Sequence, residues 1–350
     1  MRRRTLLGRA FLVGGVVLLP FWSVIAQPQV LARPILIGAL VSGSDANDPR
    51  YLGSLRRGLK ELGYSEGRDY VLEIRSAEGS VIRLQDFARE LVLLKPGLIF
   101  ATSAVAASVA RAVTAEIPIV SPFLGDGLNS GLIASQARPG GNVTGLLGPL
   151  DAGLIGKQLS LVREIIPGAD KVGYIFNSPN PNSEGQRKNA ATAAASLSIE
   201  LSVIDVQSPD ELGKAFMLLA SAGVKAVFVA ADPMFFKERR RMAEAAQAAA
   251  LPTVFGFREH VEAGGLASYG IDLVESYRRA AKYVDKIVSG EKPAEIPVEL
   301  PTKFEMAINL KTAKAIGITI PESFLVRADE VIDKVRRRLR TISLNLHLIG

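Results

Sequence analysis

The sequence predicts an α/β protein with two lobes, each a doubly wound parallel sheet covered by helices. Short apolar runs alternate with longer segments of helical periodicity, which is the pattern of strands joined by crossover helices. A dense turn cluster, Arg138-Pro139-Gly140-Gly141-Asn142, interrupts this alternation, which then begins again. The 350 residues are 48% hydrophobic, enough for two cores. These observations favour two similar lobes joined near residue 150, with a cleft between them.

In the first lobe, the predicted strands are short apolar runs and the predicted helices are longer amphipathic segments. They follow one another as strand 35–41, helix 51–62, strand 70–75, helix 82–94, strand 98–101, helix 104–115 and strand 117–120. Gly63, Gly67 and Pro96-Gly97 supply the stops, because glycine frees the backbone after a helix and proline cannot continue one.

After the turn cluster, a short strand at 143–145 and an amphipathic helix at 154–166 lead into the second lobe. Its predicted elements are strand 172–176, helix 186–197, strand 199–206, helix 209–222, strand 226–231, helix 236–250, strand 253–257 and strand 266–269.

The end of the chain does not form a third domain. The last part of the chain contains a helix at 274–288, a proline-punctuated segment at 293–301, and a strand that leads into a helix at 304–317. These elements are too few to form a domain of their own, so we expect them to return and complete both lobes. Residues 34–150 and about 273–300 then form lobe 1, and residues 151–272 and about 301–332 form lobe 2. Several crossovers between lobes make a hinge.

Residues 1–26 are predicted to be an export signal. The cationic start Met1-Arg2-Arg3-Arg4 precedes an apolar run at 10–19 that is too short to span a bilayer, and Val24-Ile25-Ala26 fits a cleavage site. We therefore expect cleavage near Ala26 and a periplasmic protein, with the ordinary secretory route favoured over a twin-arginine route. The alternative is an uncleaved anchor.

The net charge of +7 is concentrated at the two ends of the chain. The leader carries four arginines and the tail at 333–350 carries another basic cluster, so the body between them is close to neutral. A near-neutral body lacks the broad electropositive surface that nucleic-acid binding requires, and no nucleic-acid partner is expected. The basic tail is predicted to be disordered, with docking as a minority alternative.

The composition also argues against metal, cofactor and enzyme chemistry. The chain has no cysteine, and its two histidines, His260 and His347, cannot form a multi-histidine metal site. No nucleophile elbow, metalloprotease helix, phosphate-binding loop or dinucleotide fingerprint occurs. We expect a protein that is not an enzyme and that has no cofactor or bound metal.

Candidate ligand-binding residues follow the carboxyl ends of the predicted strands, where open parallel sheets bind ligands. These residues are Ser42, Ser44, Thr102, Ser103, Ala104, Phe123, Asn177, Asp232, Phe257, Arg258, Tyr269 and Asp272.

Thr102 and Ser103 stand where a strand ends and a helix begins. Their hydroxyls and the free N–H groups of the helix suit a carboxylate or another anion. The alternative is that one of them only caps the helix.

Asp232 follows an apolar strand of the second lobe and would face the cleft. A carboxylate there can hold an ammonium group, or it can cap the helix that begins near Pro233. Both interpretations stay open for Asp232, whereas capping is the stronger one for Asp272. Arg258 can bridge the lobes or bind an anion, and its alternative is a solvated surface position.

Phe123, Phe257 and Tyr269 can sandwich an apolar or planar ligand. Core packing is the alternative, and it is favoured for Phe255 because strand alternation turns it away from the face used by Phe257.

Several motifs together resemble one protein family. Four segments carry the resemblance: Gly58-Leu59-Lys60-Glu61-Leu62-Gly63-Tyr64, Arg138-Pro139-Gly140-Gly141-Asn142-Val143-Thr144-Gly145, Gly264-Gly265-Leu266-Ala267-Ser268-Tyr269-Gly270 and Pro301-Thr302-Lys303-Phe304-Glu305. They are similar to segments of the ABC-transporter substrate-binding proteins related to the tryptophan-binding component of bacterial importers. The resemblance runs from about Pro34 to Ile332. It implies the type I periplasmic-binding-protein fold, in which two Rossmann-like lobes are joined by three crossovers.

The resemblance implies a receptor that closes over a small solute, like a flytrap, and delivers it to an ABC permease in the inner membrane. We expect this receptor to be a monomer. By similarity, Thr102 and Ser103 would take the carboxylate of an amino acid, Asp232 its amine, and Phe257 or Tyr269 an aromatic side chain. A departure occurs at Asp126-Gly127, where many relatives have Asp-Pro, and this puts the shape of that loop in doubt. The alternative function is a periplasmic ligand sensor for a membrane signalling protein.

Overall fold

A computed structural model describes residues 33–43, 48–148, 151–301 and 303–333. The predicted export signal, Ser44 and the basic tail beyond Asp333 lie outside these described residues. The elements described below belong to one compact unit that begins at Pro34. Within the described ranges, no helix combines the length and the hydrophobicity needed to cross a membrane.

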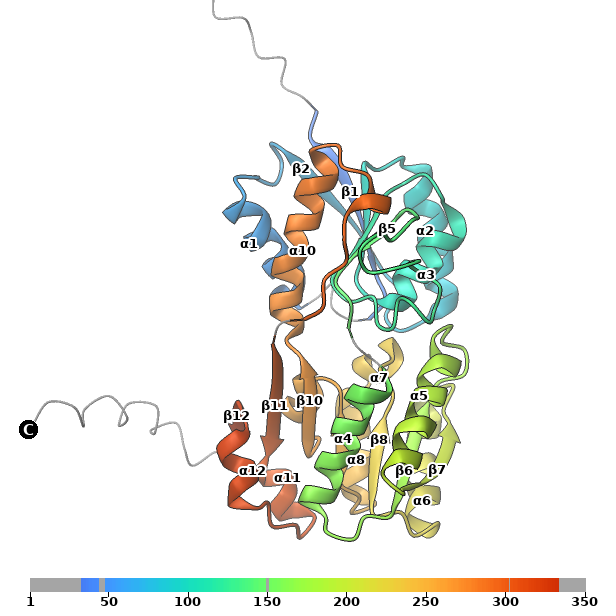
Figure 1. Cartoon of the computed structure of the whole chain (residues 1–350), viewed down its shortest axis with the longest axis vertical. Helices are drawn as coiled ribbons and strands as arrows, with labels where there is room; N and C mark the ends of the chain where they lie inside the picture. Colours follow the sequence, from blue (N-terminus) through green and yellow to red (C-terminus); the bar gives the residue numbers. More distant parts are fainter. Residues whose placement is uncertain (1–32, 44–47, 149–150, 302, 334–350) are drawn as a thin grey trace, which may run out of the picture. The chain divides into compact units, whose positions relative to one another are not determined.

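The first lobe is built on a five-stranded parallel sheet, counted over the described residues. Its order β2-β1-β3-β4-β5 joins β1 (Ile35–Val41), β2 (Tyr70–Ser76), β3 (Leu98–Ala101), β4 (Ile119–Ser121) and β5 (Val143–Gly145). Helices α1 (Pro49–Glu61) and α10 (Leu273–Val288) cover one face, and α2 (Val81–Leu93) and α3 (Ala104–Val113) cover the other (Figure 1).

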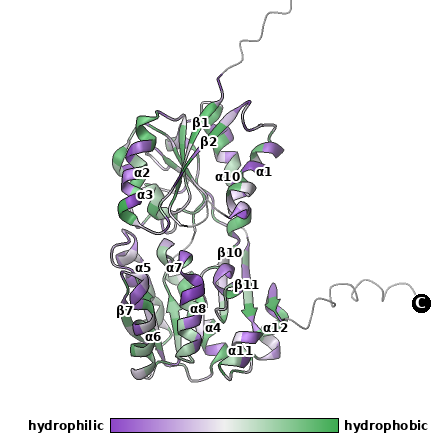
Figure 2. Cartoon of the chain, turned by 180° about the vertical axis from the view of Figure 1, so that it is seen from behind, coloured by the Kyte–Doolittle hydropathy of each residue, from purple (hydrophilic) through white to green (hydrophobic). Residues whose placement is uncertain are grey.

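The second lobe contains a seven-stranded sheet over the described part of the chain. Its order is β12-β11-β10-β9-β8-β6-β7, with β6 (Lys171–Phe176), β7 (Glu200–Asp205), β8 (Ala226–Val229), β9 (Thr253–Phe255), β10 (Ala267–Ile271), β11 (Phe304–Asn309) and β12 (Glu330–Ile332). Helices α4 (Ala152–Ile165) and α5 (Ser183–Ser196) pack on one face, while α6 (Leu212–Ser221) and α8 (Arg239–Ala248) pack on the other. Figure 2 shows the resulting pattern, with largely apolar strands and a hydrophilic α8.

The doubly wound α/β fold is therefore confirmed, with one difference in strand direction. β11 pairs antiparallel with β10, although the other pairs of this sheet are parallel. The chain leaves the second lobe after β10, runs through α10 in the first lobe, and re-enters from that side. It therefore enters β11 at the end where β10 finishes, which sets the antiparallel direction.

Helix α10 belongs with the first lobe because it packs tightly against α1. At Gly58 of α1, a Cβ atom would lie 2.3 Å from the carbonyl oxygen of Arg278 in α10. Only glycine permits this approach. The described elements alternate between the lobes three times along the chain, from β5 to α4, from β10 to α10 and from α10 to β11.

Several predicted elements differ in detail. The predicted helix 236–250 is two helices, α7 (Pro233–Lys237) and α8, because Asp232 caps an earlier start and Pro233 occupies its first turn. The predicted strand 253–257 ends at Phe255, and the short helix α9 (Arg258–Glu262), which was not predicted, follows it. Also unpredicted are α12 (Glu322–Arg327) and β12; α11 (Leu310–Ala315) is the predicted helix after β11.

Candidate functional site

The topology places a switch point in each sheet, where consecutive strands lie on opposite sides of a starting strand. In the first sheet it lies between β1 and β3, and in the second between β6 and β8. The loops that follow these strands diverge at such a point and leave a crevice for a ligand. The switch points supply Ser42, Thr102 and Ser103 from one lobe and Asn180 and Asp232 from the other.

A cavity of about 540 Å³ lies between these loops. Its lining comes from both lobes and comprises Ser42, Gly43, Thr102, Ser103, Ala104, Val105, Phe123, Gly125, Asp126, Asn129, Ser130, Asn180, Pro181, Asn182, Glu184, Gly185, Gln186, Lys188, Asn189, Ala231, Asp232, Pro233, Phe236, Phe257, Leu273 and Tyr277. This size is in the usual range for a small-molecule site. Seven of the predicted site residues are in this lining: Ser42, Thr102, Ser103, Ala104, Phe123, Asp232 and Phe257.

Three hydroxyl groups cluster at the N-terminus of α3. The Ser42 Oγ atom lies 2.8 Å from Ser103 Oγ and 3.4 Å from Thr102 Oγ1. Ser103 also caps the helix, because its Oγ accepts the N–H of Ala106 over 3.2 Å. The capping interpretation of Ser103 is therefore correct, yet both Ala104 and Val105, whose N–H groups precede the first helical bonds, line the cavity. Hydroxyls and helix N–H groups together form a neutral donor site suited to an anion.

An aromatic wall adjoins the hydroxyl cluster. Phe123 of the first lobe and Phe257 of the second lobe pack edge-to-face, with their ring centroids 5.5 Å apart. Phe236 lies edge-on to Phe257 at 5.9 Å, and Tyr277 of α10 also lines the cavity. The wall can hold a flat apolar group next to the anion donors.

Asp232 is a fully engaged helix cap. Its Oδ1 accepts the N–H groups of Met234 and Phe235 over 2.7 and 3.3 Å. Its Oδ2 accepts the side-chain amides of Asn177 and Asn180 over 3.1 and 2.8 Å. Burial raises the pKa of Asp232, and these four donors act in the opposite direction. Because a carboxylate has about four acceptor sites, the structure favours the cap over the predicted ammonium contact.

At another part of the cavity lining, Asp126 of the first lobe contacts the second lobe. Its Oδ2 accepts the side-chain amide of Asn129 over 2.5 Å and that of Asn189, from α5 of the second lobe, over 3.3 Å. The loop whose shape was in doubt therefore contributes a polar contact across the cavity.

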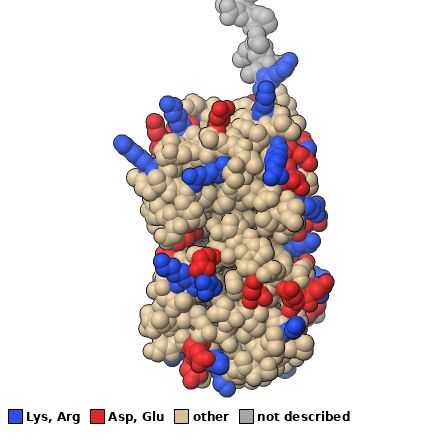
Figure 3. All heavy atoms as spheres, turned by 90° about the vertical axis from the view of Figure 1, so that its right-hand side faces the viewer, with Lys and Arg blue, Asp and Glu red and all other residues tan. Residues whose placement is uncertain are grey.

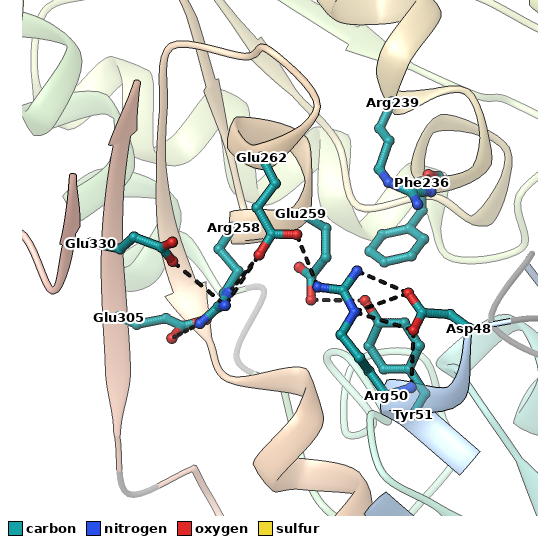
Figure 4. A network of polar contacts seen from close by, with 10 residues as sticks. All are labelled: Asp48, Arg50, Tyr51, Phe236, Arg239, Arg258, Glu259, Glu262, Glu305 and Glu330. Carbon is teal, nitrogen blue, oxygen red and sulfur yellow. Dashed lines mark hydrogen bonds and ion pairs between the residues drawn. The ribbon is translucent and has the colours of Figure 1, made fainter. Parts of the chain in front are cut away.

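Four predicted site residues do not line the cavity. Arg258 turns away to ion pairs with Glu262 at 3.1 Å and with Glu305 and Glu330 at 3.5 Å each (Figure 4). Arg258 was predicted to bind the ligand, but it does not line the cavity because the unpredicted helix α9 directs it toward β11 and β12. Tyr269 stacks on Phe304 at 5.8 Å within the second lobe.

Asp272 caps α10 by accepting the N–H of Glu275 over 3.0 Å. This confirms capping, the interpretation that the sequence favoured. Asn177 touches Asp232 and is absent from the lining. Ser44 lies outside the described residues.

Several lining residues do not follow from the ends of the predicted strands. Asn180 lies three residues after the predicted site residue Asn177, and its amide donates to Asp232 over 2.8 Å. Phe236 and Tyr277 lie on helices, where an aromatic side chain in an amphipathic pattern is indistinguishable from core. Asp126 and Asn129 follow β4; the departure at Asp126-Gly127 drew attention to their loop, but it did not predict the contact of Asp126 with Asn189.

The charged side chains around the lobes carry both signs. On the face drawn in Figure 3, Lys and Arg residues are interspersed with Asp and Glu, and most of the surface is uncharged.

Glu305, beside one crossover, is expected to make stability depend on pH. Its burial, followed by the neighbouring carboxylate of Asp272, raises its pKa from 4.5 to about 7, although Arg258 opposes the shift. Between these values the folded protein keeps a proton that the unfolded chain releases, so the part of the stability that depends on Glu305 is fully present below about pH 4.5 and is lost as the pH rises to about 7. Replacing Glu305 by Gln is expected to remove this part of the slope.

Urea unfolding of both proteins from pH 4.5 to 7.5 measures the difference. The control is Glu330→Gln, which removes a more exposed carboxylate from the same arginine. Parallel stability curves for the wild type and Glu305→Gln would contradict the assignment.

Comparisons with known proteins agree on one group. A family model described as ABC transporter substrate binding protein matches residues 35–332. A tyrosine-binding protein of Clostridioides difficile strain R20291 is 27% identical over 262 residues, which cover 75% of each chain. The solved ABC domain from Streptococcus pneumonia in complex with L-Trp has a TM-score of 0.78 and 26% identity, covering 85% of this chain and 100% of that one. A conserved domain protein from Vibrio cholerae has a TM-score of 0.79 and 26% identity, covering 86% and 100%.

Proposed function

The chain belongs to the family of ABC transporter substrate-binding proteins, and from this premise we propose that it is the periplasmic receptor of an importer for a small carboxylate-bearing ligand, an aromatic amino acid. The ligand occupies the cavity between the lobes and is released unchanged to an inner-membrane permease. The receptor acts as a monomer, and residues 1–26 direct its export.

The juxtaposition of anion donors and aromatic rings in one cavity carries this proposal. Ser42, Thr102 and the N-terminus of α3 offer donors to a carboxylate, and no acidic side chain belongs to that cluster within the described residues. Phe123, Phe257 and Phe236 stand within the same cavity as an apolar wall. A ligand that carries both a carboxylate and an aromatic side chain fits both the donor cluster and the apolar wall of the cavity.

The relatives support the same ligand class. One is named a tyrosine-binding protein, and one was solved in complex with L-Trp. Both are aromatic amino acids. The amine is not assigned to Asp232, because that carboxylate already accepts four hydrogen bonds.

Ligand capture requires the lobes to separate and close again. The lining comes from both lobes, so a bound molecule makes its full set of contacts only when they meet. Such a ligand stabilises the closed form by its differential affinity.

A thermal-shift screen tests the proposal. The purified protein is heated with each of the standard amino acids, with aromatic acids, with small carboxylates and, for comparison, with sugars and simple amines. Aromatic amino acids at concentrations well above their dissociation constants are expected to raise the midpoint, since a ligand of the folded state stabilises it by mass action. A shift given by sugars or amines, and by none of the carboxylates, would contradict the proposal.

A further inference from the structure

A polar network joins helix α1 of the first lobe to helix α9 of the second (Figure 4). The hydroxyl of Tyr51 donates to Oε1 of Glu259 over 2.8 Å. One residue earlier, Nη1 of Arg50 donates to Oε2 of Glu262 over 2.9 Å. Glu259 and Glu262 are three residues apart, and so they share a face of α9. Two consecutive residues of one lobe therefore hold both carboxylates of the other.

Each partner of the ion pair is also held by a residue of its own lobe. Within the first lobe, Asp48 accepts from Nε and Nη2 of Arg50 over 3.0 and 2.9 Å. Within the second, Glu262 accepts from Nε and Nη2 of Arg258 over 3.2 and 3.1 Å. Because each partner is already oriented, joining them costs little additional side-chain entropy.

The tyrosine bond is buried. Tyr51 is 1% exposed and Glu259 is 2% exposed. The second oxygen of Glu259, Oε2, has no hydrogen-bond partner among the described residues. Burial raises the pKa of Glu259, and the hydrogen bond from Tyr51 acts against that shift. While the lobes are together, loss of the Tyr51 hydroxyl would leave this buried carboxyl without its side-chain donor, which is costly.

Tyr51 also contacts the cavity wall from behind. Its ring lies 5.4 Å from that of Tyr277 and 6.1 Å from that of Phe236. Both of those rings line the cavity, whereas Tyr51 does not. One residue thus packs against the ligand site and binds the opposite lobe.

We propose that Arg50 and Tyr51, with Glu262 and Glu259, form an interlobe latch that stabilises the closed arrangement and so sets ligand affinity without touching the ligand. In this structure the latch coexists with the contact of Asp126 with Asn189 across the cavity. Both contacts therefore belong to one arrangement of the lobes. The inference rests on the proposed closure over a ligand. A ligand that binds only the closed form has an affinity proportional to the fraction of molecules that are closed.

The test is an interlobe distance in the empty protein. The chain has no cysteine, so a pair introduced as Gln85→Cys in α2 and Lys214→Cys in α6, both exposed positions, takes spin labels selectively. Tyr51→Phe removes only the hydroxyl and is expected to reduce the ratio of closed to open molecules about tenfold, which lengthens the measured distances. Glu262→Ala, which breaks the ion pair, is expected to act in the same direction.

The matched control is Tyr64→Phe. Tyr64 also donates its hydroxyl to a carboxylate, Asp285, over 2.7 Å, but both residues belong to the first lobe. Its distance distribution is expected to match that of the wild type. The proposal is overturned if Tyr51→Phe and Glu262→Ala leave the distances unchanged or shorten them while both variants remain folded by circular dichroism.

Titration with L-tryptophan separates this inference from the proposed function. The latch predicts weaker binding in Tyr51→Phe than in Tyr64→Phe, by up to about tenfold, because a tenfold lower closed-to-open ratio lowers the closed fraction by at most that factor. Loss of binding in every variant, the wild type included, counts against the proposed ligand class, whereas the distances in the empty protein decide the latch.

Discussion

Replacing Asp232 by Ala is expected to destabilise the empty protein by about 3 kcal/mol, because the cap of α7 is lost and two buried amides lose their acceptor. The carboxylate accepts from Met234, Phe235, Asn177 and Asn180, and it is 7% exposed. Urea unfolding of the ligand-free protein measures the change.

Asp126→Ala is the control for this result. Asp126 also lines the cavity but is more exposed and accepts from Asn129 and Asn189, so its loss is expected to cost less than about 1 kcal/mol. If Asp232→Ala weakened ligand binding and left the stability of the empty protein unchanged, the carboxylate would serve the ligand and our interpretation of the cap would be wrong.

The double substitution Ser42→Ala with Thr102→Val is expected to weaken amino-acid binding about 100-fold, since each hydroxyl that donates to a carboxylate contributes about tenfold. Ser103 is left in place, so the cap of α3 on the N–H of Ala106 remains. Calorimetric titration with L-tyrosine and L-tryptophan measures the loss.

A third hydroxyl provides the comparison. Thr144 is buried in the first lobe, where its Oγ1 donates to the carbonyl of Ile296 over 3.0 Å, away from the cavity lining. Thr144→Val is expected to bind both amino acids as the wild type does. Equal loss in the two proteins would show that the effect comes from a disturbed first lobe and not from the ligand's carboxylate.

Topology made part of the site predictable. Ser42, Thr102 and Asp232 were found because strand ends in a parallel sheet are given by hydrophobic runs, and the switch points bring those ends together. The sequence could not decide between capping and binding at Asp232, because both roles place a carboxylate between a strand and a helix. Only the positions of the amides of Asn177 and Asn180 show that its acceptors are occupied.

Lining residues on helices cannot be predicted from the positions of strand ends. Tyr277 reaches the cavity because α10 returns from the second lobe to pack on α1, and a local pattern does not specify that return. Arg258 was misplaced for a related reason. A continuing strand would have carried it to the cleft, but the chain turns into α9 after Phe257, and its guanidinium meets Glu305 and Glu330 instead.

Binding of a carboxylate in the cavity is tested most directly by calorimetric titration with matched ligands that differ in that group. L-Tyrosine and L-tryptophan are compared with tyramine and tryptamine, which keep the ring and the amine but lack the carboxylate. We predict saturable one-to-one binding of at least one amino acid and no measurable binding of either amine. Binding of the amines as tight as that of the amino acids, or binding by none of the four, would contradict the account.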